Sequence, residues 1–201
     1  MQSGLFSISP ENLLPFDGET HYFDGFFQKV EANQYFEKLI NQIEWKQEPI
    51  KIFGKEIMQP RLTALYGNPE KPYGYSGITM QPLAWTDFLL QMKNKVEEEA
   101  KTNFTHVLLN YYRDGKDSMG WHRDNEAVLG PNPTIASVSF GEMREFQIRH
   151  HTEKKFKIKL PLNHGSLLIM SGKSQHHWEH QIPKTAKLLG ARINLTFRKI
   201  K

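Results

Sequence analysis

The sequence predicts an α+β domain whose centre is a barrel or jelly roll of mostly antiparallel strands, with N-terminal helices covering one face. Apolar residues recur with a helical period in two segments of the N-terminal half. After His106 the period changes to two, and turn residues separate the apolar runs. Many short strands without intervening helices are typical of double-sheet barrels.

Two segments, Glu31–Ile43 and Trp85–Lys101, predict amphipathic helices. Each carries a single apolar stripe, which we expect to face the core rather than a cofactor. The stripes consist of Tyr35, Phe36, Leu39, Ile40 and Ile43 in the first helix, and of Trp85, Phe88, Leu89, Met92 and Val96 in the second.

The second half of the chain predicts short strands with alternating side chains. Glycine, proline and asparagine clusters, such as Gly130-Pro131-Asn132-Pro133, mark the turns between them. The expected strands are Val107–Tyr112, Thr134–Phe140, Glu145–His150, Phe156–Leu160, Ser166–Met170, His176–His180 and Arg192–Lys199.

The composition is that of one water-soluble globular domain. The chain has 201 residues, of which 38% are hydrophobic and 24% are charged, and it has no cysteine. Disulfides and thiolate metal sites are therefore excluded. No apolar run approaches the roughly 18 residues of a membrane span, and residues 1–16 lack the basic start of a signal peptide. We expect a monomer without membrane contact, in a bacterial cytoplasm or a eukaryotic nucleus.

The net charge of +4 is unevenly distributed along the chain. The first 44 residues carry seven acidic and two basic residues, so the rest of the chain is strongly basic. A basic face suits an anionic partner, of which nucleic acid is the commonest. A solvated basic face without a ligand is an equally good explanation of charge alone.

His122 and Asp124 form a candidate metal-binding pair. Two residues apart in an extended segment, they point to the same side. An imidazole and a carboxylate are two of the three ligands in the 2-His-1-carboxylate triad that binds Fe(II). The third ligand could be His176, His177 or His180, although most isolated His-x-Asp triplets are merely polar surface residues.

The last predicted strand is polar on one side. Arg192, Asn194, Thr196 and Arg198 alternate with apolar residues and share one face. On the inner side of a barrel they would need a ligand or partners, and arginine is suited to gripping a carboxylate. Otherwise, this face simply meets water.

These blocks together resemble the AlkB-type Fe(II)/2-oxoglutarate dioxygenases over roughly Ile52–Lys201. The family pattern is His-x-Asp, a distal histidine before Gln181-Ile182-Pro183, and Arg-x-Asn-x-Thr-x-Arg. The resemblance implies a double-stranded β-helix (jelly-roll) core in a single domain. About residues 1–105 would form an N-terminal extension and nucleotide-recognition part, and about 106–201 the catalytic core. Further matching blocks are Asn110-Tyr111-Tyr112-Arg113-Asp114-Gly115, Pro133–Phe140 (with Ser137-Val138-Ser139-Phe140-Gly141) and His164–Leu168.

The resemblance also implies a role for each matching residue. His122, Asp124 and His180 would be the iron ligands, with 2-oxoglutarate and O2 as cosubstrates. Arg192 and Arg198 would bind the 2-oxoglutarate carboxylates, assisted by Asn110, Tyr112 and Thr196. Six strand residues span roughly 20 Å, so we favour Arg192 as the direct carboxylate ligand.

Further residues are similar to the branch that repairs alkylated bases in duplex DNA. Phe53 and Gly54 match an apolar finger that fills the gap left by a flipped base. Each feature also has an ordinary structural explanation, and Asn125 stands where that branch often has an aspartate. The other matching residues are Arg61 near the finger, Tyr73 and Tyr75 in the base pocket, and Glu126 at the exocyclic nitrogen.

The implied function is oxidative demethylation of 1-methyladenine and 3-methylcytosine in DNA, preferably duplex, with release of formaldehyde. Single-stranded DNA or RNA are further possible substrates. The alternatives are a protein that binds alkylated nucleic acid without turnover, and a dioxygenase acting on RNA, a small molecule or a protein. Candidate phosphate contacts are Arg144, Arg149, Lys154, Lys155, Lys157 and Lys159.

Overall fold

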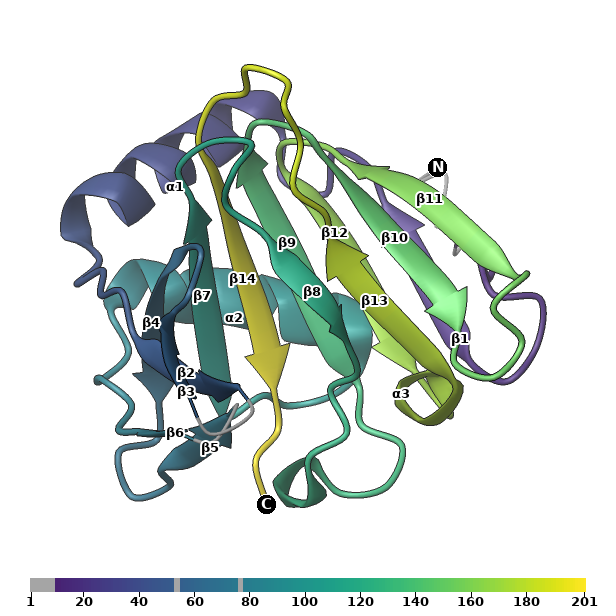
Figure 1. Cartoon of the computed structure of the whole chain (residues 1–201). Coiled ribbons are helices and arrows are strands. Elements are labelled where there is room, and N and C mark those ends of the chain that lie inside the picture. The colour runs from purple at the N-terminus through teal and green to yellow at the C-terminus, as the bar shows by residue number, and fades with distance from the viewer. Residues whose placement is uncertain (1–9, 53–54, 76–77) are drawn as a thin grey trace, which may run out of the picture.

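Two antiparallel β-sheets face each other in the computed structural model, which describes residues 10–52, 55–75 and 78–201 (Figure 1). This arrangement confirms the predicted jelly roll. The six-stranded sheet has the order β1 (Glu19–Phe23), β12 (Ser166–Ser171), β9 (Ile135–Gly141), β14 (Arg192–Arg198), β7 (His106–Tyr112), β4 (Leu62–Gly67). The four-stranded sheet has the order β11 (Lys157–Leu162), β10 (Arg144–His150), β13 (Trp178–Ile182), β8 (Met119–His122).

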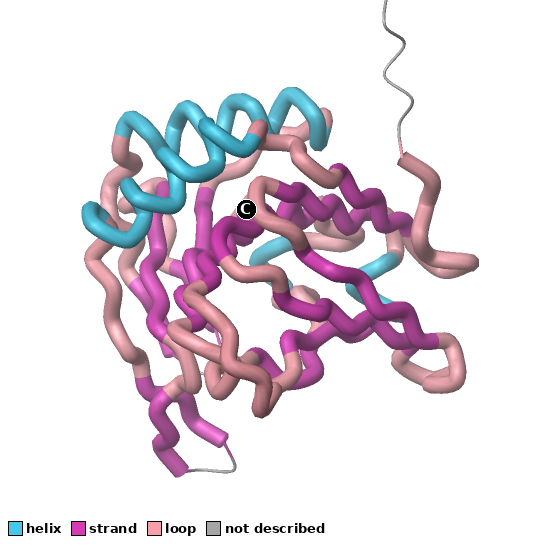
Figure 2. Tube along the Cα trace, turned by 90° about the horizontal axis from the view of Figure 1, so that it is seen from above, coloured by secondary structure: helices cyan, strands magenta, loops and turns pink. Residues whose placement is uncertain are grey.

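Two helices, α1 (Lys29–Gln42) and α2 (Asp87–Ala100), cover the outer face of the large sheet (Figure 2). Four of the five residues predicted for the second stripe are confirmed, since Phe88, Leu89, Met92 and Val96 are buried, whereas the fifth, Trp85, precedes α2 and is partly buried. In the first helix Leu39 is buried, but Ile40 is 37% exposed, so the predicted stripe was one residue too wide. None of the helices in the described part of the chain is long and apolar enough to cross a membrane.

The large sheet is buried on both faces, and β14 shows why its sequence alternates. Ile193, Leu195 and Phe197 belong to the core beneath the helices. The polar residues between them face the small sheet and line a cavity. The alternative in which this polar face meets water is therefore wrong, because Arg192 and Arg198 are only 1% and 3% exposed.

Most of the predicted strands of the second half are present within one or two residues, but the stretch His176–His180 is not one strand. Residues Ser174–His177 form a short helix, α3, and β13 begins at Trp178. The amide groups of His176 and His177 donate to the carbonyl of Lys173 and close this turn. The alternation there came from polar residues, which do not specify a half-buried strand.

Several strands of the N-terminal half were not predicted. β1 and β4 form the two edges of the large sheet, so the first hundred residues contribute directly to the barrel. Two small hairpins lie outside both sheets. They are β2 (Pro49–Ile52) with β3 (Lys55–Met58), and β5 (Tyr73–Tyr75) with β6 (Ile78–Met80).

Candidate active site

Two side chains of the small sheet and one from the loop after β8 converge on one point. His122 ends β8 and pairs in register with His180 of β13, so their rings lie 4.3 Å apart between centroids. Asp124 follows two residues later, and its Oδ1 is 3.9 Å from His122 Nε2. One potential ligand atom from each residue lies within 4.8 Å of the others. This spacing suits a metal ion held by two imidazoles and a carboxylate.

Both histidines are in the form that can bind a cation. Burial lowers the pKa of His122, and it lowers the pKa of His180 to about 3, so both rings are neutral at physiological pH. The Nδ1 atom of His122 lies 2.8 Å from the carbonyl oxygen of Gly120, to which it donates. The Nε2 atom of His122 is therefore unprotonated on the side that faces Asp124.

Asp124 is a buried carboxylate that is held in the ionised state. Burial alone would raise its pKa, but the guanidinium of Arg198 and the neighbouring histidines hold it at about 2. Arg198 Nη2 donates to both carboxylate oxygens at 2.9 Å. The backbone amide of Asp124 donates to Gln175 Oε1 at 2.9 Å, which fixes the loop after β8.

A cavity adjoins these ligands between the two sheets, and Arg192 lies in its wall. Its Nη2 donates to Ser139 Oγ at 2.9 Å, and its guanidinium carbon is 5.1 Å from the centre of the Tyr112 ring. Burial lowers the pKa of Arg192 to about 10, yet it stays charged at neutral pH. Among the described residues its Nε and Nη1 have no hydrogen-bond partner. Buried donors without acceptors cost free energy, so these two nitrogens favour the binding of an anion such as a carboxylate.

The remaining residues assigned to 2-oxoglutarate also line this cavity. Asn110, Tyr112, Thr196 and Arg198 are all buried. Thr196 Oγ1 donates to Asn194 Oδ1 at 3.0 Å, and this bond fixes the Asn194 amide in the wall. The structure therefore brings every residue of the predicted metal and 2-oxoglutarate sites around one cavity.

The predicted substrate residues have a more varied placement. Arg61 is buried and donates to Asn110 Oδ1 at 2.7 Å, so its guanidinium supports the cavity wall. Asn125 is exposed and Glu126 partly exposed, both in the loop after Asp124. Tyr73 and Tyr75 lie in β5, and only their backbone is described. Phe53 and Gly54 lie outside the described residues.

One of the predicted phosphate contacts is wrong. Arg144 is 3% exposed, and its guanidinium donates to the carbonyls of Asp114, Asp117 and Pro183. It therefore ties the loop before β8 to the end of β13. Arg149 stacks on the Trp121 ring and pairs with Glu179. The remaining candidates, Lys154, Lys155, Lys157 and Lys159, are exposed on or beside β11.

Sequence reasoning missed three residues that support the site. Ser139 bonds to Arg192, Ser137 accepts from Asn194, and Gln175 accepts from Asp124. The alternation of Ser137 and Ser139 in an otherwise apolar strand was a signal for two of them, because polar residues with period two mark one face. Gln175 had no comparable local signal.

Fold and site together define a jelly-roll protein with a 2-His-1-carboxylate triad beside an anion-binding arginine. A model of the 2OG-Fe(II) oxygenase superfamily matches residues 19–198. The chain is 43% identical to the alpha-ketoglutarate-dependent dioxygenase alkB homolog 3 of Bos taurus, over 88% of this chain and 64% of that protein. It is 39% identical to the DNA oxidative demethylase ALKBH2 of Homo sapiens, over 87% of this chain and 70% of that protein.

The chain therefore belongs to the 2OG-Fe(II) oxygenase superfamily and, within it, to the AlkB-type oxygenases. The solved structure of OsALKBH1 shares the fold, with a TM-score of 0.64 at 17% identity over 90% of this chain and 97% of that one. Membership implies Fe(II), 2-oxoglutarate and O2. The chain spans a little less than two thirds of the bovine alkB homolog 3.

Proposed function

We propose that the protein is an Fe(II)- and 2-oxoglutarate-dependent dioxygenase that removes methyl groups from N-alkylated bases of DNA. His122, Asp124 and His180 would hold the iron, and Arg192 would hold a carboxylate of 2-oxoglutarate. When bound, the iron supplies activation of O2, with 2-oxoglutarate as the reductant that becomes succinate and CO2. The methyl group is hydroxylated, and it leaves as formaldehyde.

One observation carries this proposal. Buried Arg192, two of whose nitrogens have no hydrogen-bond partner among the described residues, lines the same cavity as the three candidate metal ligands. A metal triad alone would fit many enzymes, and a buried arginine alone could be structural. Their combination fits a small diacid bound beside the cation, because arginine binds carboxylates through two donors at once.

DNA as the substrate is supported by the relatives and by charge. The human and bovine ALKBH2 relatives are named DNA oxidative demethylases. The exposed lysines of and beside β11 provide a basic surface on the small sheet, which carries the two histidine ligands. A methyl group at N1 of adenine or N3 of cytosine blocks pairing, so such a base is easier to extrude.

The preference for duplex DNA is the finer part of the proposal, and it rests on Phe53-Gly54 as an inserted wedge. The proposed contacts of the flipped base are Tyr73, Tyr75, Asn125 and Glu126. We further propose that the protein acts as a monomer, in a bacterial cytoplasm or a eukaryotic nucleus.

The test is incubation with Fe(II), 2-oxoglutarate and a 1-methyladenine oligonucleotide, either single-stranded or duplex. We expect formaldehyde and succinate in equal amounts. His122→Ala should abolish both products but leave much of the phosphate-driven affinity for DNA. Binding of methylated DNA without formaldehyde would instead identify a non-catalytic protein.

The proposed wedge at Phe53 is tested by comparing turnover on duplex and single-stranded DNA. Phe53→Ala should lower turnover on duplex DNA more than on the matching single strand, since only the duplex has a stack to fill. An equal effect on both substrates would contradict the duplex preference and leave the demethylase proposal intact.

A further inference from the structure

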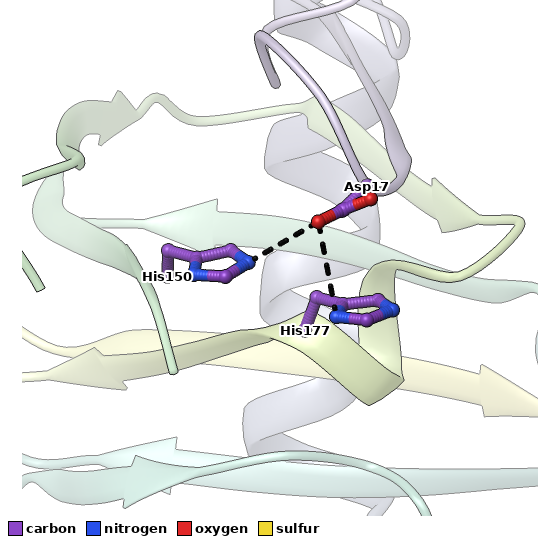
Figure 3. Close-up of side chains that lie close together, drawn as sticks. All are labelled: Asp17, His150 and His177. Carbon is purple, nitrogen blue, oxygen red and sulfur yellow. Dashed lines mark ion pairs between the residues drawn. The ribbon is translucent and has the colours of Figure 1, made fainter. Parts of the chain in front are cut away.

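A second group of two histidines and one carboxylate lies outside the cavity (Figure 3). It consists of Asp17, His150 at the end of β10, and His177 at the end of α3. His150 Nε2 is 3.6 Å from Asp17 Oδ2, and His177 Nδ1 is 3.9 Å from the same oxygen. One potential ligand atom from each residue lies within 4.8 Å of the others. These are the residue types and spacings of the His122–Asp124–His180 triad.

The fold holds Asp17 in place before any ligand binds. Asn12 closes the loop by bonding to the carbonyl of Gly18 and the amides of Leu14 and Thr20. Asp17 adopts a left-handed backbone conformation, with φ of 52°, which aspartate tolerates better than most residues. Gly18 then lies so close to α3 that a Cβ atom there would be 2.7 Å from the Cα atom of Ser174.

The two histidine rings present their edges to Asp17. They are parallel to within 8°, with centroids 5.9 Å apart. The His150 side chain is 4% exposed and lies against Phe16 and Trp178, and its Nε2 has no hydrogen-bond partner among the described residues. The Asp17 and His177 side chains are 47% and 39% exposed, so solvent reaches the open side of the group.

We propose that Asp17, His150 and His177 bind a divalent transition-metal ion, and Zn²⁺ is the ion that we use to test the site. Zinc bonds of about 2.0–2.1 Å place tetrahedral ligands about 3.3 Å apart, so the Asp17–His150 distance needs to shorten by about 0.3 Å and the Asp17–His177 distance by about 0.6 Å. The distance between His122 Nε2 and Asp124 Oδ1 needs the same closure as the Asp17–His177 distance. Two imidazoles among three donors favour Zn²⁺ over Mg²⁺ or Ca²⁺, which prefer oxygen ligands. Water would complete the coordination on the exposed side.

The hydrogen bonds of His150 make this site weaker than the His122 site. The backbone amide of Glu153 donates to His150 Nδ1 at 3.0 Å, so in the ion-free protein the ring proton sits on Nε2. Metal binding requires the proton on Nδ1, where Thr152 Oγ1 is 3.2 Å away and can accept it. The Glu153 amide then loses its acceptor. The ion should therefore leave this site at a lower chelator concentration than the ion at His122.

A bound ion would join three segments that are distant in the sequence. Asp17 precedes β1, His150 ends β10, and His177 leads into β13, which carries His180. Because the ion binds only the folded protein, it should raise the melting temperature.

The experiment is equilibrium dialysis of the full chain against Zn²⁺, followed by elemental analysis. We expect two ions per wild-type chain and one per chain in His177→Ala, and Asp17→Asn should behave like His177→Ala. Both residues are partly exposed, so these variants should fold. His176→Ala is the matched control, because its exposed ring lies outside the group, and it should keep the wild-type count. Dialysis against Mg²⁺ or Ca²⁺ should fill neither histidine site.

A second measurement isolates the new site from the candidate active site. In a His122→Ala background, Zn²⁺ should still raise the melting temperature, and adding His177→Ala should remove that increase. If His177→Ala and His176→Ala bind the same number of ions and melt alike with Zn²⁺, the proposed site does not exist. A failure of the His122 site would appear separately, as an ion count unaffected by His122→Ala.

Discussion

Arg198 donates from a single nitrogen, Nη2, to both carboxylate oxygens of Asp124, each at 2.9 Å. Arg198 is 3% exposed and Asp124 is 1% exposed, and they join β14 of the large sheet to the loop after β8. An ionised carboxylate in such a buried place needs a partner. Arg198 therefore fixes the orientation of Asp124, a candidate iron ligand, as residues that hydrogen-bond to metal ligands do in other metal sites.

Arg198→Lys tests this role, because lysine keeps the charge but loses the planar geometry of the guanidinium. We expect the Fe(II) concentration that gives half-maximal succinate formation to rise roughly 10–100-fold, as for other partners of metal ligands. Arg113→Lys is a suitable control, since its ion pair with Asp117 is outside the cavity and the Arg113 side chain is 45% exposed. An unchanged Fe(II) dependence with a raised KM for 2-oxoglutarate would show that Arg198 binds only the cosubstrate.

Arg192 should determine the affinity for 2-oxoglutarate. Hydrogen bonds to charged groups contribute roughly 1.5–3 kcal/mol, so Arg192→Gln should raise the KM for 2-oxoglutarate by about 10–100-fold. The Fe(II) dependence and the affinity for unmethylated DNA should stay at the wild-type level. Steady-state kinetics with varied 2-oxoglutarate provide the measurement. A wild-type KM in a folded Arg192→Gln protein would rule out this arginine as the carboxylate ligand.

Local patterns predicted the parts of the site that lie on one strand. The period-two alternation placed Arg192 and Arg198 on one face, and the spacing of His122 and Asp124 placed two ligands together. The third ligand could not be chosen among His176, His177 and His180 from spacing, because the choice depends on the register between β13 and β8. That register is set by contacts between residues almost sixty positions apart.

The sequence likewise did not predict which individual basic residues are buried. Arg144 and Lys155 belong to the same basic stretch, yet the first is 3% exposed and the second has a side chain that is 75% exposed. The difference arises because residues 114, 117 and 183 approach Arg144 from distant parts of the chain and present their carbonyl oxygens. Composition and charge patterns carry no information on such contacts.

His106 should make the stability of the protein depend on pH. Burial lowers its pKa, and its Nε2 donates to the carbonyl oxygen of Lys71 at 2.8 Å. The unfolded chain protonates this histidine near pH 6.5, whereas the folded protein keeps it neutral to a lower pH. The unfolded state therefore binds more protons in this interval, and the free energy of unfolding should decrease as the pH falls below about 6.5.

His106→Gln measures this contribution, because the glutamine amide can still donate to Lys71 but does not titrate. Urea unfolding at pH 7.5, 6.5 and 5.5 should show a shallower decrease for this variant than for the wild type. His176→Gln, a change at an exposed position, should follow the wild-type curve. Parallel curves for His106→Gln and the wild type would mean that another group causes the pH dependence.

Variants of Arg144 and Lys155 should have opposite effects, because Arg144 stabilises the fold whereas Lys155 is a candidate contact of DNA. Arg144→Met preserves much of the side-chain volume but leaves three carbonyl groups without their donor. We expect the free energy of unfolding to fall by roughly 2–4 kcal/mol, since each buried acceptor without a partner is costly. The salt dependence of DNA binding should not change.

Lys155→Ala should instead keep the stability and, if the lysine contacts a phosphate, reduce the slope of log K against log salt by about 0.9. Chemical unfolding and DNA titrations at several salt concentrations distinguish the two. The assignment of Arg144 to the fold would be overturned if Arg144→Met unfolded like the wild type and reduced the salt slope.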